Sequence, residues 1–327
     1  MMNNVQGIKA RSRAASWVAL GLAGAVCALS SGGSWASDPA ECKMVKLGST
    51  NWSDTVATSA MAQLAMESLG YQVKLTTASQ QIILAGLADK KLDTFLGYWQ
   101  PTMQPVATPY IQKQQIQVLV PAALPDAQST FAVPRYAFDA GLRTFGDIAK
   151  FKDKLDSKIY VIEPGSGSNR ITAEMIESDQ FGLKGFTLME SSEAGMLTAV
   201  KRAVSRQEWV VFFGWKPHPM NLQLDMVYLT GSDDVFGPGE GAATVSVMTA
   251  NGYEQRCPNS GRLLQNLSFK SDLVSHLMVP ILERVSPRDA AFAWLKANSE
   301  QVKPWFDGVT TLDGKPGFDA FQHFLNK

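Results

Sequence analysis

Short apolar runs alternate with amphipathic segments along most of the chain. Runs rich in β-branched and aromatic residues predict strands at 44–47, 72–76, 94–96, 116–119, 131–133, 158–162, 187–190, 210–213 and 226–229. Apolar residues at helical spacing predict helices at 54–69, 80–89, 145–151, 171–176, 193–204, 262–267, 270–284, 287–298 and 318–325, with the chain mainly helical after about residue 237. This alternation predicts an α/β fold of mainly parallel sheets flanked by helices.

The strand–helix alternation occurs twice, and Pro121 and Pro125 lie between the two series. We expect two lobes, with residues 37–127 and 222–327 forming the first and residues 128–221 the second. A cleft between two such lobes is the default place for a ligand, and hinge closure around the ligand is the matching motion.

Three tryptophans each follow the end of a predicted strand. Trp52 follows 44–47, Trp99 follows 94–96, and Trp215 follows 210–213. Ligands of open α/β sheets bind at the carboxyl ends of the strands, and converging indole faces hold quaternary ammonium groups by cation–π attraction. The pattern therefore predicts an aromatic cage. The alternative is three unrelated core tryptophans, because tryptophan is highly buried on average.

The first 36 residues have the features of a secretory signal peptide. Lys9, Arg11 and Arg13 are basic, residues 14–29 are apolar, and residues 34–36 form a small-x-small cleavage site, so we expect a periplasmic protein that begins near Ser37. The chain has 30 basic and 30 acidic residues. This charge balance does not indicate a nucleic-acid partner.

Cysteine usage agrees with export. Cys27 lies in the predicted signal peptide, which leaves Cys42 and Cys257. An exported pair predicts a disulfide that ties both ends of the chain into one domain; two buried thiols are the alternative. Three histidines and no Cys-x-x-Cys motif give no metal-site spacing.

Five motifs resemble the periplasmic substrate-binding proteins of ABC importers for quaternary amines, the glycine betaine, choline and carnitine group, and most nearly its choline-binding branch. They are Asn-Trp-Ser-Asp at 51–54, Phe-Leu-Gly-Tyr-Trp-Gln-Pro-Thr-Met at 95–103, Ile-Glu-Pro-Gly at 162–165, Gly-Trp-Lys-Pro-His-Pro-Met at 214–220 and Asp-Asp-Val-Phe-Gly-Pro at 233–238. The resemblance implies a two-lobed, hinged fold, a membrane permease as partner, no cofactor and a monomer.

The resemblance also implies site residues. Trp52, Trp99 and Trp215 fall on walls of the family's aromatic box, Asp54 on an acid that faces the cation, and Asn169 on a residue that contacts the other end of the ligand. For Asp54, plain N-capping of the following helix is the alternative. For Asn169, the alternative is an ordinary Gly-rich turn before a helix.

Two positions depart from the choline-branch pattern. Ser129 replaces a tyrosine wall, and Lys216 replaces a glutamate. A smaller wall and an added base favour carnitine, ahead of glycine betaine and then choline. Two alternatives stay open: Lys216 points to solvent, as long charged side chains usually do, or Phe131 rebuilds the missing wall.

No combination of residues predicts catalysis. The Gly-rich stretch at 163–170 lacks a nucleotide-binding pattern, and His218, between two prolines, has no accompanying nucleophile motif. We therefore expect a binding protein that is not an enzyme. A secreted enzyme acting on a small cationic substrate is the alternative.

Overall fold

The computed structural model describes residues 38–327. The predicted signal peptide and Cys27 lie outside the described residues. Within 38–327, no helix combines the length and the apolar character that crossing a membrane requires.

Ten strands form one sheet in the order β2-β1-β3-β10-β5-β8-β6-β7, with β4 paired to β10 and β9 paired to β5. The strands are β1 Met44–Ser49, β2 Gln72–Thr77, β3 Thr94–Gln100, β4 Ile116–Val118, β5 Leu124–Pro134, β6 Lys158–Val161, β7 Thr187–Glu190, β8 Val211–Lys216, β9 Met226–Tyr228 and β10 Ala242–Ala250.

The α-helices are α1 Ser53–Ser68, α2 Gln80–Ala88, α3 Gln104–Gln112, α4 Arg135–Asp139, α5 Phe145–Ile148, α6 Gly167–Glu177, α7 Glu193–Ser205, α8 Met220–Gln223, α9 Asp233–Phe236, α10 Pro238–Gly241, α11 Tyr253–Arg256, α12 Pro258–Asn266, α13 Ser271–Leu282, α14 Pro287–Ala297 and α15 Gly317–Leu325. Short 3₁₀ helices lie at η1 Ala40–Lys43, η2 Ala149–Phe151, η3 Gln180–Gly182 and η4 Ser299–Phe306.

Two parallel groups of strands lie at the two ends of the sheet. β1, β2 and β3 form one group, and β6, β7 and β8 form the other. The antiparallel strands β5 and β10 lie between them. We call β1–β3 with the helices and loops packed around them the first lobe, and β6–β8 with theirs the second lobe. The predicted α/β class with mainly parallel, helix-flanked sheets is confirmed.

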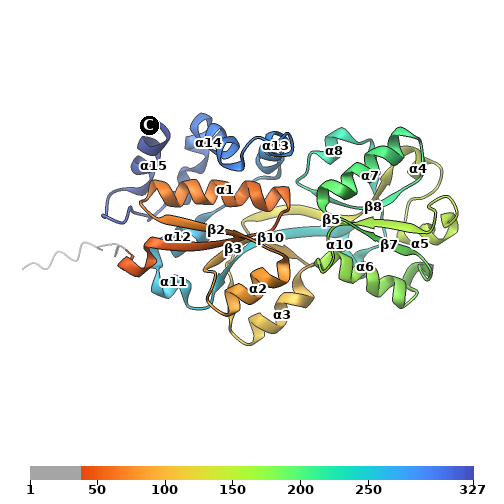
Figure 1. Cartoon of the computed structure of the whole chain (residues 1–327), viewed down its shortest axis with the longest axis horizontal. Coiled ribbons are helices and arrows are strands. Elements are labelled where there is room, and N and C mark those ends of the chain that lie inside the picture. The colour runs from red at the N-terminus through yellow and green to blue at the C-terminus, as the bar shows by residue number, and fades with distance from the viewer. Residues whose placement is uncertain (1–37) are drawn as a thin grey trace, which may run out of the picture. The chain divides into compact units, whose positions relative to one another are not determined.

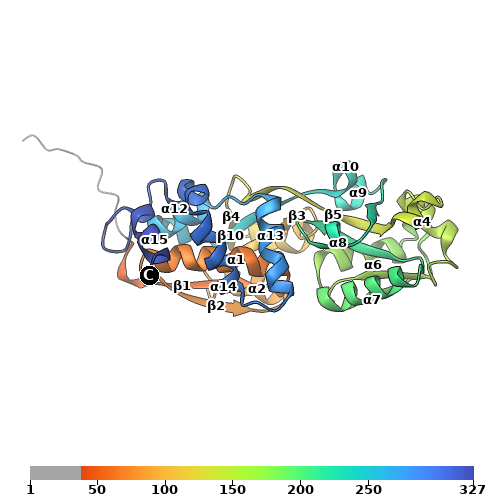
Figure 2. The same ribbon diagram turned by 90° about the horizontal axis from the view of Figure 1, so that it is seen from above.

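Helices cover both faces of the sheet in each lobe. In the first lobe, α1, α13 and α14 lie on one face, and α2 and α3 lie on the other (Figure 1). In the second lobe, α7 and α6 lie on opposite faces. Figure 2 shows the same two groups of elements from above. The buried alanines of α1 leave little side-chain bulk in the way of its neighbours, so α1 packs closely in the first lobe.

The start of the described chain is joined to a segment more than 200 residues later. Cys42 and Cys257 form a disulfide with their Cα atoms 5.7 Å apart and 215 positions apart in sequence, which confirms the predicted bridge. The buried carboxylate of Asp38 also accepts hydrogen bonds from the backbone N–H groups of Asn259 and Ser260, at 2.6 and 2.9 Å. The start of the described chain is therefore fixed to helix α12.

The sequence predicted a mainly helical chain after about residue 237, which is correct except for β10, a strand that the prediction missed. This strand is built largely from alanine, threonine, serine and valine, so it has no long apolar run, and pairing along both edges with β3 and β5 stabilises it. The predicted lobe boundaries at 127/128 and 221/222 lie within β5 and α8, and the division at these residues stays a prediction.

Candidate functional site

A cavity with about 370 Å³ of empty space, part of it open to solvent, lies between the two lobes. Its aromatic lining consists of Trp52, Trp99, Phe213 and Trp215. Its other lining residues are Asp54, Gln80, Thr102, Met103, Ser129, Ile162, Ser166, Gly167 and Ser168.

The three predicted cage tryptophans come together at this cavity from three separate elements. Trp52 precedes α1 as its N-cap residue, whereas Trp99 and Trp215 are the penultimate residues of β3 and β8. The latter two therefore lie inside the strands rather than past their ends. The sequence prediction ended both strands too early because a glycine interrupts each apolar run, and the sheet continues through it.

Hydrogen bonds and ring contacts fix the orientation of each indole. Trp52 Nε1 donates to Glu163 Oε1 at 2.5 Å, and Trp99 Nε1 donates to Asp54 Oδ2 at 3.0 Å. The ring of Trp215 packs edge-on against His218, with 4.8 Å between ring centroids. All three tryptophans are at most 6% exposed.

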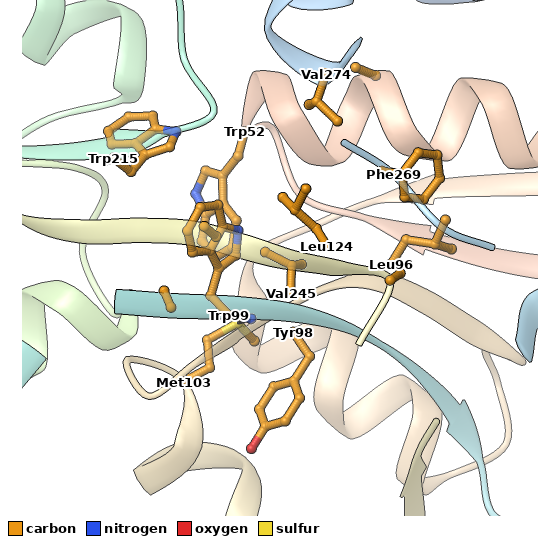
Figure 3. Close-up of a cluster of buried hydrophobic side chains, with 14 of the residues drawn as sticks. Trp52, Leu96, Tyr98, Trp99, Met103, Leu124, Trp215, Val245, Phe269 and Val274 are labelled. Carbon is orange, nitrogen blue, oxygen red and sulfur yellow. Dashed lines mark hydrogen bonds between the residues drawn. The ribbon is translucent and has the colours of Figure 1, made fainter. Parts of the chain in front are cut away.

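Figure 3 shows the three indoles together on one side of a buried cluster. Tyr98 points to the opposite side of β3 from Trp99, because successive side chains alternate across a strand. The same alternation brings Ser129 and Trp215 together. The two residues are directly opposite in the antiparallel pair of β5 and β8, and both line the cavity.

Asp54 is the charged residue of the cavity lining. It lies in the first turn of α1, and the N-cap position itself is occupied by Trp52. Burial, with a smaller effect from the negative charge of Glu193, raises the pKa of Asp54 to about 7. The hydrogen bond from Trp99 opposes this shift. A cation in the cavity would favour the ionised form of this carboxyl group.

Two further polar side chains at the cavity have unused hydrogen-bonding groups. Ser129 Oγ and Gln80 Nε2 are buried and have no hydrogen-bond partner in residues 38–327. Phe131 does not rebuild the missing wall, because it packs against Phe145 and Phe236 and is not part of the lining. Phe213 supplies the additional aromatic surface.

Asn169 and Lys216 are not among the lining residues. Asn169 is buried, and its amide nitrogen donates to Ile162 O at 2.8 Å and to Glu190 Oε1 at 2.9 Å, while its amide oxygen accepts from Ser166 Oγ at 2.8 Å. Lys216 is exposed, with its Nζ 5.3 Å from the centre of the Tyr228 ring. As the residue after Trp215 in β8, it points to the other face of the strand.

The two lobes also meet beside the cavity. Glu193 Oε2 accepts from the backbone N–H of Ser53 at 2.9 Å, and Glu193 Oε1 accepts from the Ser53 hydroxyl at 2.5 Å. His218 reaches the same carboxylate oxygen, with its Nε2 3.0 Å from Oε1. Because His218 Nδ1 accepts from the Met220 N–H, the proton of the neutral ring is on Nε2 and points to Glu193. His218 therefore has a structural contact here, in line with the lack of a nucleophile motif beside it.

At Gly167 the backbones of the two lobes pass close to each other. Its N–H donates to Gln80 Oε1 at 3.3 Å, and a Cβ atom at this position would lie 2.1 Å from the carbonyl oxygen of Thr102. Thr102 lies in the first lobe and Gly167 begins α6 in the second. Only glycine therefore fits where the two backbones pass.

Sequence reasoning missed several lining residues. Thr102 and Met103 were part of a quoted motif without an assigned role, and Phe213 was assigned to the apolar strand. Ser166 and Ser168 lie in the Gly-rich stretch that was considered. Gln80 gave no signal beyond the start of a predicted helix.

The chain matches the family OpuAC, the substrate binding domain of ABC-type glycine betaine transport system, over residues 43–297. A solved ABC-transporter choline binding protein in complex with choline is 42% identical, with a TM-score of 0.85, and the match covers 88% of this chain and 100% of that chain. The ProX protein of Borrelia burgdorferi is 25% identical with a TM-score of 0.75, covering 84% and 100%.

Two curated proteins match parts of the chain. The uncharacterized protein ORF1 of Chromohalobacter salexigens is 37% identical over 40% of this chain and 84% of its own length. The glycine betaine/carnitine transport binding protein GbuC of Listeria monocytogenes is 27% identical over 50% of this chain and 53% of its own length. The family match spans most of the described residues, and the chain therefore belongs to the substrate-binding domains of ABC-type glycine betaine transport systems.

Proposed function

We propose that this protein captures a small quaternary ammonium compound in the cavity between its lobes and delivers it to the membrane permease of an ABC importer. The observation that carries the proposal is the meeting of Trp52, Trp99, Trp215 and the carboxyl group of Asp54 at one cavity. A periplasmic location, reached through the predicted signal peptide, and a monomeric state complete the proposal.

The chemistry of the lining suits a methylated cation. Each indole face attracts a cation with about 0.5–2 kcal/mol, and more when the site is desolvated. A quaternary ammonium group has no N–H to donate, so aromatic faces and a nearby negative charge are what can hold it. Asp54 supplies that charge when ionised, and no basic side chain lines the cavity within residues 38–327.

The lining bears on the choice among choline, glycine betaine and carnitine. The sequence-based preference for carnitine depended on Ser129 and on Lys216 meeting the ligand's carboxylate. Ser129 lines the cavity, but Lys216 does not. With Asp54 present and no base to balance a second carboxylate, we propose choline first, then glycine betaine and carnitine. The 42% identical solved relative, a choline binding protein, supports this order.

Titration calorimetry with the three ligands tests the proposal, and proton NMR of the same mixtures over hours detects any turnover. We expect saturable binding without a product, choline binding most tightly. No binding of any quaternary amine would contradict the proposal, whereas a different order would change only the ranking. The enzyme alternative is not favoured, because the chain's relatives are substrate-binding proteins.

A further inference from the structure

Gln80 has an unusual position for a buried amide. It is the first residue of α2, it is 1% exposed, and it lines the cavity. Its Nε2 has no hydrogen-bond partner in the described part of the chain. Buried donors in native proteins are nearly always paired, and an unpaired one is unfavourable. A bound ligand that supplies an acceptor would remove this penalty.

The other end of the same amide is already paired. Gln80 Oε1 accepts a hydrogen bond from the N–H of Gly167, at 3.3 Å, from the second lobe. This contact distinguishes the two ends of the amide, since only the oxygen can accept. The two N–H donors of Nε2 are therefore left over at the cavity wall.

The two ends of a quaternary amine differ in what they need from a binding site. The methylated end needs aromatic faces and a negative charge, which Trp52, Trp99, Trp215 and Asp54 provide. The other end of choline or glycine betaine carries an oxygen, which needs a donor. Ser129 Oγ is a second unpaired polar atom of the lining, but Gln80 is the one that can only donate from its free end.

We infer that Gln80 is a specificity-determining residue, whose Nε2 donates a hydrogen bond to the oxygen at the non-methylated end of the bound quaternary amine. The inference rests on the proposed function and extends it to the selection among cations. A site built to hydrogen-bond a ligand oxygen rejects an analogue without that oxygen, because its own donor then stays buried and unpaired.

The test compares choline with propyltrimethylammonium, in which a methyl group replaces the hydroxyl group. Calorimetry on the unaltered protein is expected to show choline binding at least about tenfold more tightly. The Gln80→Met variant keeps the length of the side chain but has no donor. It should bring the affinity ratio of the two ligands close to one, even if loss of the contact with Gly167 weakens both.

Gln81→Met is the matched control. Gln81 follows Gln80 on α2, but its side chain is exposed and its Nε2 donates to Gly165 O of the second lobe at 2.5 Å. Loss of this contact between lobes should weaken the binding of both ligands by the same factor and leave the ratio of their affinities unchanged.

Gln80→Glu is a second probe. It keeps an acceptor for Gly167 and replaces the donors with a negative charge. Binding of glycine betaine should fall more than binding of choline, because the hydroxyl group of choline can donate to the new carboxylate whereas the carboxylate of betaine is repelled.

The inference is overturned if the unaltered protein binds choline and propyltrimethylammonium equally, or if Gln80→Met keeps the original ratio. A circular dichroism spectrum like that of the unaltered protein shows that each variant is folded. If no quaternary amine binds the unaltered protein at all, the proposed function itself fails, which is a distinct result.

Discussion

Glu193, the first residue of α7 in the second lobe, accepts hydrogen bonds from both the backbone N–H and the hydroxyl group of Ser53, the first residue of α1 in the first lobe. The N-cap of α1 is Trp52, which has no side-chain acceptor for the free N–H groups of the helix. A carboxylate from 140 residues further along the chain takes that role. Negative charge at a helix N-terminus is stabilising, so lobe contact and helix capping coincide next to the cavity.

Loss of this contact should weaken ligand binding without changing specificity. Glu193→Gln keeps the size of the side chain and removes its charge. A charged hydrogen bond contributes about 1.5–3 kcal/mol, so we expect all quaternary amines to bind about tenfold more weakly, as measured by calorimetry. Glu174→Gln, at an exposed ion pair with Arg170 in the same lobe, is the control and should have little effect. Equal affinities of the two variants would show that the contact does not contribute to closure.

The proposed aromatic cage makes a prediction for each tryptophan. Trp52→Ala, Trp99→Ala and Trp215→Ala are each expected to weaken choline binding at least about tenfold, since each removes one cation–π face. Trp209→Ala is a matched control, because Trp209 is partly buried against Phe151 and is absent from the cavity lining. Normal binding by all three cage variants, each confirmed to be folded, would show that the cage is not the site.

The raised pKa of Asp54 predicts how choline binding varies with pH. A bound cation favours ionised Asp54, so binding expels a proton from a group whose pKa is raised from 3.8 to about 7. Affinity should therefore increase by about tenfold from pH 6 to pH 8 and level off above that. Asp54→Asn should bind more weakly and lose most of this dependence. A flat profile for the unaltered protein would contradict the prediction.

The raised pKa of Asp54 also affects the stability of the unliganded protein, which should fall as the pH rises, whereas ligand affinity should increase. Because the folded state holds the Asp54 proton more tightly than the unfolded state, this carboxyl group stabilises the fold fully below its ordinary pKa. That contribution is lost as the pH rises through about 7. Without ligand, the free energy of unfolding measured with denaturant should decline less between pH 4 and pH 8 in Asp54→Asn than in the unaltered protein. Glu163, whose pKa is also raised by burial, accounts for part of what remains.

The disulfide should affect stability and not binding. Cys42 and Cys257 close a loop of 215 positions, and the chain-entropy model assigns about 4–5 kcal/mol to such a bridge, often less in practice. The double serine variant should have a free energy of unfolding lower by up to that amount, measured by denaturant unfolding. It should bind choline normally, because neither cysteine lines the cavity. Alkylation of the unreduced protein followed by mass spectrometry checks the bridge itself; two alkylated thiols would reject it.

Features that depend on local pattern could be predicted from the sequence. Apolar periodicity identified α1, α7 and the strands of both lobes, and the glycine-interrupted runs placed Trp99 and Trp215 near strand ends. β10 could not be identified in this way, because its stability comes from pairing between two neighbours distant in sequence.

The site residues show the same difference between what local pattern predicts and what tertiary contacts decide. Lys216 was assigned because it replaces a glutamate of the choline-branch pattern after Trp215, but neighbouring residues of a strand point to opposite faces. The polar groups of Asn169 are used by its own loop and by Glu190, which no spacing reveals. Gln80 became a candidate only when its buried, unpaired nitrogen was found beside the cavity.

The close passage of Gly167 by Thr102 has a consequence for engineering this protein. A single methyl group at residue 167 would act as a wedge, because it would lie 2.1 Å from a carbonyl oxygen that belongs to the backbone and has little freedom to move. Gly167→Ala would keep every tryptophan and the carboxyl group of Asp54, yet it would prevent the two lobes from closing fully. Such a variant would separate first contact with a ligand from closure of the lobes around it, and it would provide an open reference form for measuring that closure.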